Sequence, residues 1–232
     1  MKTTKLIIGI FALCFSTALL SAQEEDGMRY LFGPGNRDIS ISGFGGPFVG
    51  FTAMGDEFAV TSGGGGAVLF NQRFFVGGYG EGVATIHEED LTVYSRKLGK
   101  NVPYPDLKKN FGHGGFWIGY INKPHSVFHW GINSKLGFGA VTLNEGTFGS
   151  DHHDDFEYDN VFVISPELVF ELNLLKWFRI NVGVGYQYVA GINKEYEYQL
   201  PDGKTEYRKY FEPADFSKPN GHISFLFGWF EN

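Results

Sequence analysis

The chain has 232 residues, a formal net charge of −7 and one cysteine. Its acidic balance argues against binding to nucleic acid or to an anionic lipid surface, and one cysteine excludes a disulfide framework within the chain. It is rich in aromatic residues and glycine, with 24 Phe, 12 Tyr, 4 Trp and 33 Gly, which is unusual for a soluble domain.

Residues 1–22 are predicted to be a secretory signal peptide. Lys2 and Lys5 precede an apolar run over 6–20, and Ser21-Ala22 supplies small residues for cleavage. Removing this segment leaves 17 basic residues against 26 acidic ones. No later apolar run approaches the roughly 18 residues that a membrane-spanning helix needs. Residues 23–36 are polar and are predicted to be a periplasmic lead-in.

From residue 37 onward, the sequence predicts eight β-strands. They cover about 38–53, 57–70, 73–87, 110–121, 127–143, 161–173, 177–192 and 219 to the C-terminus. The connections after the second, fourth and sixth strands are tight turns. The segments 88–108, 144–159 and 193–218 are predicted to be long polar loops. Pro47 cannot donate to a ladder, so a bend or bulge is expected in the first strand.

The last strand alternates between two different faces. Its apolar face holds Ile223, Phe225, Phe227 and Trp229, and its other face holds His222, Ser224 and Gly228. The strands predicted over 127–143, 161–173 and 177–192 alternate in the same way, with aromatic residues on one face and charged residues on the other.

Two barrels fit this alternation. A membrane barrel directs the aromatic face to lipid and the charges into its lumen, whereas a soluble, lipocalin-like barrel directs them the opposite way. Glycines on the polar face, such as Gly183 and Gly185, favour the membrane arrangement, because an eight-stranded barrel has little internal room. Tight turns at one end and long loops at the other favour it too. The facing of the glycine-rich strands near 57–82 is left open; a working register points Arg73, Phe75, Tyr79 and Glu81 inward.

The signal peptide, the run Phe70-Asn71-Gln72-Arg73-Phe74-Phe75-Val76-Gly77-Gly78-Tyr79-Gly80 and the aromatic last strand resemble small outer-membrane β-barrel proteins of Bacteroidota-type Gram-negative bacteria, with an OmpA/OmpX-like architecture. The resemblance covers nearly the whole mature chain. It implies an all-β protein, an eight-stranded antiparallel transmembrane β-barrel over 37–232, with short periplasmic turns and longer outer loops. It also implies the bacterial outer membrane as location, and outer-membrane lipid, lipopolysaccharide and the barrel-assembly machinery as partners. No cofactor is expected.

Four charged residues are predicted to meet inside the barrel as a lumen ion cluster: Glu81, Lys135, Glu167 and Arg179. Each opposes an apolar neighbour on its own strand. Charges that face a narrow lumen must pair or lose solvation free energy, so we expect them to fill the lumen. The functional alternative is a gated conduit.

Two other groups of residues could carry chemistry. His222 and Ser224 resemble the His-x-Ser pair of outer-membrane lipid A deacylases, although those enzymes carry the pair on the lipid-facing side. Asp151, His152, His153 and Asp154 contain ligands that suit a divalent metal, but adjacent ligands in a loop rarely form a closed coordination shell. A solvated acidic loop, or one that bridges to lipopolysaccharide phosphates through divalent cations, is the alternative.

The sequence therefore predicts an outer-membrane β-barrel with a filled polar lumen and a structural or interaction role, displaying its loops at the cell surface. An unidentified extracellular ligand could bind these loops. The alternative functions are a lipid-modifying enzyme that uses His222 and Ser224, and a small-solute conduit of the OmpW kind.

Overall fold

The structure is a computed structural model, and it describes residues 39–145 and 158–230. The predicted signal peptide over 1–22 and lead-in over 23–36 fall outside these residues. In the part of the chain that is described, no helix is long and apolar enough to cross a membrane.

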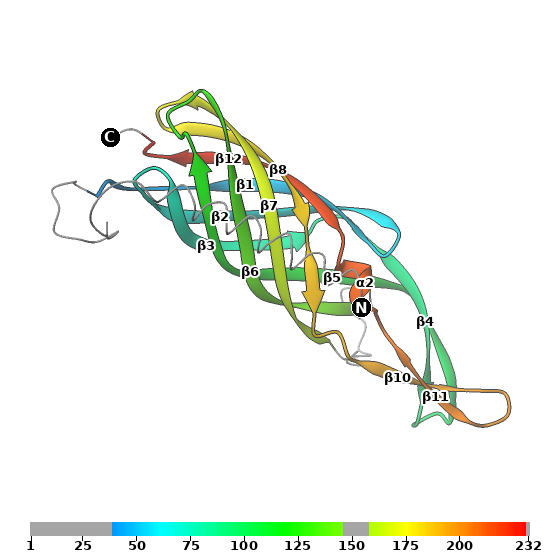
Figure 1. The fold of residues 1–232 in the computed structure, drawn as a ribbon. Coiled ribbons are helices and arrows are strands. Elements are labelled where there is room, and N and C mark those ends of the chain that lie inside the picture. Colours follow the sequence, from blue (N-terminus) through cyan, green and yellow to red (C-terminus); the bar gives the residue numbers. More distant parts are fainter. Residues whose placement is uncertain (1–38, 146–157, 231–232) are drawn as a thin grey trace, which may run out of the picture. The chain divides into compact units, whose positions relative to one another are not determined.

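Eight antiparallel strands form a closed ring (Figure 1). They are β1 (Ile41–Met54), β2 (Glu57–Phe70), β3 (Phe74–Val83), β5 (Lys100–Asn122), β6 (Phe128–Glu145), β7 (Asp159–Leu175), β8 (Phe178–Tyr186) and β12 (Pro219–Gly228). The ring closes because β1 pairs with β12 and β3 pairs with β5. This confirms the predicted all-β, eight-stranded antiparallel barrel. A short strand, β9 (Tyr188–Ala190), continues β8 beyond Gln187 and pairs with β7.

Tight turns join the strands at one end of the barrel, which we call the turn end. After β2, the Arg73 N–H donates to the Phe70 carbonyl at 3.0 Å, and Asn71 and Gln72 between them have φ of 51° and 57°. Positive φ at both central residues is the geometry of a type I′ turn, whose twist matches that of the flanking strands. Arg73 lies in this turn and is exposed. Its predicted inward position is therefore wrong, because β3 begins only at Phe74.

At the opposite end, which we call the hairpin end, two of the predicted loops contain regular strands (Figure 1). β4 (Glu88–Ser95) pairs with the first part of β5, which begins about ten residues earlier than predicted. The segment 193–218 contains the hairpin of β10 (Glu195–Gln199) and β11 (Thr205–Lys209), followed by the short helix α2 (Pro213–Phe216).

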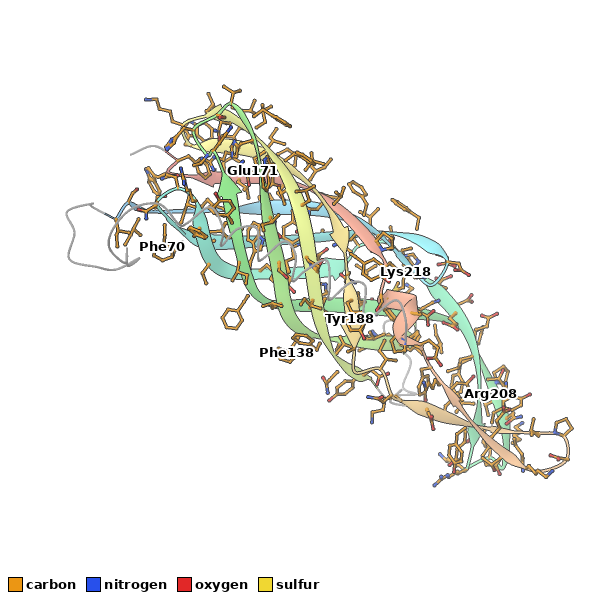
Figure 2. The ribbon with its side chains drawn as sticks, in the orientation of Figure 1. Phe70, Phe138, Glu171, Tyr188, Arg208 and Lys218 are labelled. Atoms are coloured by element: carbon orange, nitrogen blue, oxygen red, sulfur yellow. The ribbon has the colours of Figure 1, made fainter. Side chains whose placement is uncertain are left out.

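On β6, β7, β8 and β12, for which the alternation was predicted, the apolar and aromatic faces point outward. Phe138, Phe116 and Phe128 are 73%, 67% and 64% exposed, and Figure 2 shows Phe138 directed away from the barrel. Lys135 and Arg179 are buried in the interior instead. This facing confirms the predicted alternation and excludes the lipocalin-like arrangement, in which the aromatic face would fill the core.

Pro47 lies in β1 without a bulge, so of the predicted bend or bulge the register excludes the bulge. The ladder to β12 stops at Gly45↔Phe227 and resumes at Phe48↔Ser224 in the same register. The missing N–H of proline therefore coincides with a gap in the ladder and not with an extra residue. The adjacent Gly46 is required by close approach, since a Cβ there would overlap the carbonyl oxygen of Phe225.

Candidate functional site

The barrel interior consists of three layers. Two are apolar, one at each end, and a charged group lies between them; a second charged group lies beside the turn-end layer. The turn-end layer contains Phe44, Phe48, Ala67, Leu69, Phe75, Tyr79, Trp117, Ile121, Leu226 and Phe230. Its rings pack edge to face, with centroids 5.2–5.6 Å apart among Phe44, Phe75 and Trp117. The hairpin-end layer is built around Leu107, Phe111, Val163, Phe211 and Phe216.

Lys135 is the centre of the charged layer. Its Nζ lies 3.0 Å from Glu81 Oε2 and 3.5 Å from Glu167 Oε1, and 4.2 Å from the centroid of the Phe48 ring. The lysine on β6 thus joins carboxylates of β3 and β7, which are not neighbouring strands. All three side chains are more than nine-tenths buried. We call Glu81, Lys135 and Glu167 the central cluster.

Neutral side chains add hydrogen bonds to the two carboxylates, although among the described residues Glu167 Oε2 has no hydrogen-bond partner. The Thr61 hydroxyl donates to Glu81 Oε1 at 2.6 Å, and Asn220 Nδ2 donates to Glu167 Oε1 at 3.3 Å. His222 Nδ1 lies 3.5 Å from the same Glu167 oxygen. Sequence reasoning did not find Thr61 or Asn220, because a threonine and an asparagine at strand positions carry no signal of the carboxylate opposite them.

Arg179 belongs to a separate group nearer the turn end. Its guanidinium lies 3.6 Å from Glu171 Oε2 and 3.8 Å from the centroid of the Phe230 ring. His129 Nε2 lies 2.9 Å from the same Glu171 oxygen. We call His129, Glu171 and Arg179 the turn-end cluster; Glu171 is labelled in Figure 2.

The four residues predicted to meet in the lumen are therefore all on the inward face, but they lie in two groups. Glu81, Lys135 and Glu167 come together, whereas Arg179 does not join them. Glu167 and Glu171 share the inward face of β7. Four residues along a strand correspond to about 13 Å, so the two carboxylates lie at different depths of the lumen and bind different cations.

His222 and Ser224 both point into the interior from β12 and are buried. The His222 ring occupies the space beside Gly183 on β8, where a Cβ would overlap it. Ser224 lies opposite Asn181, and within the described residues its hydroxyl has no hydrogen-bond partner. The pair thus faces away from the outer surface, and the acid near it, Glu167, is already bound by Lys135.

The predicted metal ligands Asp151, His152, His153 and Asp154 lie outside the described residues. Among residues 39–145 and 158–230, no group of three or more His, Cys, Asp or Glu side chains could hold a metal ion.

The two hairpins beyond the ring contact each other through side chains. Arg96 at the β4–β5 turn forms an ion pair with Glu197 on β10. The Asn101 side chain bonds both backbone groups of Gln199, with Nδ2 donating to the carbonyl at 2.8 Å and Oδ1 accepting from the N–H at 3.0 Å. The hydrogen bonds from Arg96 lower the pKa of Glu197 from its ordinary 4.5. We call this contact the hairpin joint.

Comparison with known proteins gives a likeness among solved structures and no match by sequence. No family model and no curated protein matches the sequence. Among solved structures, that of the Neisserial surface protein A aligns with a TM-score of 0.49 and 9% sequence identity, over 84% of this chain and 100% of that chain. Function is therefore inferred from the residues of this chain.

Proposed function

We propose that the protein is an outer-membrane β-barrel whose filled lumen makes it a structural or interaction protein, with the two hairpins displayed at the cell surface. The observation that supports this most is the exposed apolar outer face, combined with charged side chains that are buried in the interior between and beside the apolar layers. Each exposed large apolar side chain in water forfeits about 1.5–3 kcal/mol that burial would gain. In a bilayer this outer face contacts hydrocarbon instead.

Exposed aromatic residues are also grouped by depth. Trp130, Trp177 and Trp229 are exposed near the turn end, and Tyr158, Tyr186 and Tyr188 are exposed toward the hairpin end. Amphipathic rings at both edges of an apolar band are typical of the girdles that mark the two faces of a membrane. This spacing supports a barrel that crosses one bilayer, with its hairpin end outside the cell.

The layered interior favours the structural role over both alternatives. A conduit of the OmpW kind needs an open lumen, but apolar side chains fill it at both ends and the central cluster lies between them. A lipid-modifying enzyme based on His222 and Ser224 needs a substrate that reaches the interior face of β12. The proposal also includes the expected partners, which are outer-membrane lipid, lipopolysaccharide, the barrel-assembly machinery and an extracellular ligand. It includes the likeness to Bacteroidota-type barrels as well.

Cell fractionation tests the proposal. The protein should be found with the outer membrane and should need detergent for extraction. Trypsin added to intact cells should cut at Lys204 and Arg208 in the β10–β11 hairpin, which are exposed, and should leave Lys135 and Arg179 intact. Recovery of the protein as a soluble periplasmic species would contradict the proposal.

A further inference from the structure

A chain of hydrogen bonds lies at the hairpin end, outside the layered interior just described. Thr85 Oγ1 and His87 Nε2 are 2.7 Å apart, and His87 Nδ1 and Glu57 Oε2 are also 2.7 Å apart. Thr85 and His87 follow β3, and Glu57 begins β2. The three residues thus provide a hydroxyl, an imidazole and a carboxylate in sequence, which is the arrangement of a nucleophile, its base and the group that orients the base.

The surrounding hydrogen bonds fix the direction of the chain. The Val60 N–H donates to Thr85 Oγ1 at 3.2 Å, so the hydroxyl proton is directed to His87 Nε2. The imidazole then carries its proton on Nδ1 and donates it to Glu57. His87 is 4% exposed, so its ring is held by packing as well as by both hydrogen bonds. With the proton on Nδ1 and a lone pair on Nε2, His87 is in the tautomer that a general base needs.

Two backbone donors lie beside the hydroxyl. Among the described residues, no hydrogen bond takes up the N–H groups of Thr85 and Ile86. The N–H groups of a nucleophile and of the residue after it can stabilise an oxyanion. Thr85 is also partly exposed, so a substrate can reach it from outside the barrel.

The surroundings of Thr85 indicate the substrate class. Ile86 and Phe58 adjoin Thr85 and Glu57 in the sequence, and their apolar side chains are 71% and 66% exposed. Glu57 on the other side of the site is open to water. In the proposed membrane location, the site therefore lies at the boundary between hydrocarbon and water, where the ester groups of acyl lipids lie.

We propose that Thr85, His87 and Glu57 form a hydrolytic site for carboxylic esters that carry an acyl chain. Thr85 Oγ1 attacks the ester carbonyl carbon while His87 Nε2 takes the hydroxyl proton, and Glu57 orients the imidazole. His87 then gives this proton to the leaving alkoxide, and an acyl-threonine is formed. A water molecule, deprotonated by His87, attacks the acyl-threonine and releases the carboxylic acid and the free threonine hydroxyl.

Hydrolysis of p-nitrophenyl butyrate and p-nitrophenyl palmitate by the full-length protein in detergent micelles tests this site. The wild type should hydrolyse at least one ester above the background rate, and Thr85→Ala and His87→Ala should each lower the rate by about 100-fold or more. Thr85→Ser should retain activity, because the hydroxyl is kept. Glu57→Gln should lower kcat with little change in KM, and Glu57→Asp should restore part of it, since Glu57 is a positioning residue.

Thr92→Ala on β4 is the matched control, because it removes a threonine hydroxyl that is not bonded to a histidine, and it should hydrolyse like the wild type. Circular dichroism melts identify variants that fail to fold. If the alanine variants fail to fold, the activities of Thr85→Ser and Glu57→Asp relative to the wild type still test the site. A wild type that hydrolyses neither ester, or a folded Thr85→Ala that hydrolyses both, overturns the site. The substrate class rests on the proposed membrane location: hydrolysis of butyrate by a protein that fractionates as soluble would refute the location and leave the site standing.

Discussion

Lys135 lies where an unpaired charge is most costly, between two buried carboxylates in a lumen closed by apolar layers at both ends. Pairing compensates for the lost hydration of all three groups, but removing the cation strands two negative charges in a medium of low polarity.

Lys135→Met should therefore lower the free energy of unfolding by about 3–5 kcal/mol. Adding Glu81→Gln and Glu167→Gln should recover much of this loss, because the two carboxylates then no longer need a cation. Urea unfolding in detergent, followed by tryptophan fluorescence, measures both effects. A triple variant that is no more stable than Lys135→Met would contradict the compensation.

The two clusters should also behave as independent units. Arg179→Met combined with Glu171→Gln should show coupling, because these side chains contact each other. Arg179→Met combined with Glu81→Gln should be additive within about 0.5 kcal/mol, as expected for separate sites. Double-mutant cycles on the same unfolding assay compare them. Coupling of equal size in both cycles would show that the lumen charges form one network.

At the scale of elements, the hairpin joint connects the two hairpins through one ion pair and two hydrogen bonds. The pKa of Glu197 is lowered by Arg96, so this carboxylate is bound more tightly in its charged form. The joint's contribution is fully present above the ordinary pKa of 4.5 and is lost as the pH falls through the lower value of the folded state.

The β10–β11 hairpin should therefore gain mobility on acidification below pH 4.5. A spin label at Asp202→Cys, at the tip of this hairpin, reports the change by electron paramagnetic resonance. In the Glu197→Gln variant the hairpin should have this higher mobility at every pH and show no such step. If Glu197→Gln shows the same acid step as the wild type, a different group controls the joint.

The outward face of the ring should tolerate charge poorly, and the hairpins should tolerate it well. Val182→Arg on β8 puts a charge on the exposed apolar face near mid-barrel and should destabilise the folded barrel in lipid vesicles by about 2–4 kcal/mol. Tyr207→Arg on β11, at a site 63% exposed, is the matched control and should be neutral. Equal effects of the two variants would mean that the apolar band does not contact lipid.

The ring strands could be predicted because burial imposes a period of two on them, and this period also gave the correct facing of Glu167 and Arg179. β4, β10 and β11 were missed because charged residues are frequent in them and their alternation is short, limited to Leu91 and Val93 on β4 and to Tyr196 and Tyr198 on β10. The partner of each lumen charge could not be predicted either. Strand period decides which side chains point inward, whereas the depth and tilt of the strands decide that Arg179 meets Glu171. The Thr85–His87 pair has the same spacing as His222 and Ser224, but its acid is 30 residues away.

For the whole molecule, the layers predict a barrel that conducts little. Planar-bilayer recordings of the wild type should show no steady ion current. Replacing Glu81 and Lys135 by Ala should leave the current low, because both apolar layers stay in place. Adding Ala at Phe44, Phe75 and Trp117 should raise it. Free conductance by the wild type would instead support the conduit.

The gap beside Pro47 has a consequence for how the barrel opens. The β1–β12 ladder joins the first and last strands of the ring with six register pairs, whereas β1–β2 has fourteen and β12–β8 has nine. The ring is thus a series of hairpins with long ladders, and it is closed by the short β1–β12 ladder, which we call the seam. Because both strands of the seam must be delivered before it can form, closure completes folding. The seam should also be the first ladder to separate when the barrel unfolds. Its amides should therefore exchange with deuterated water before those of β1–β2.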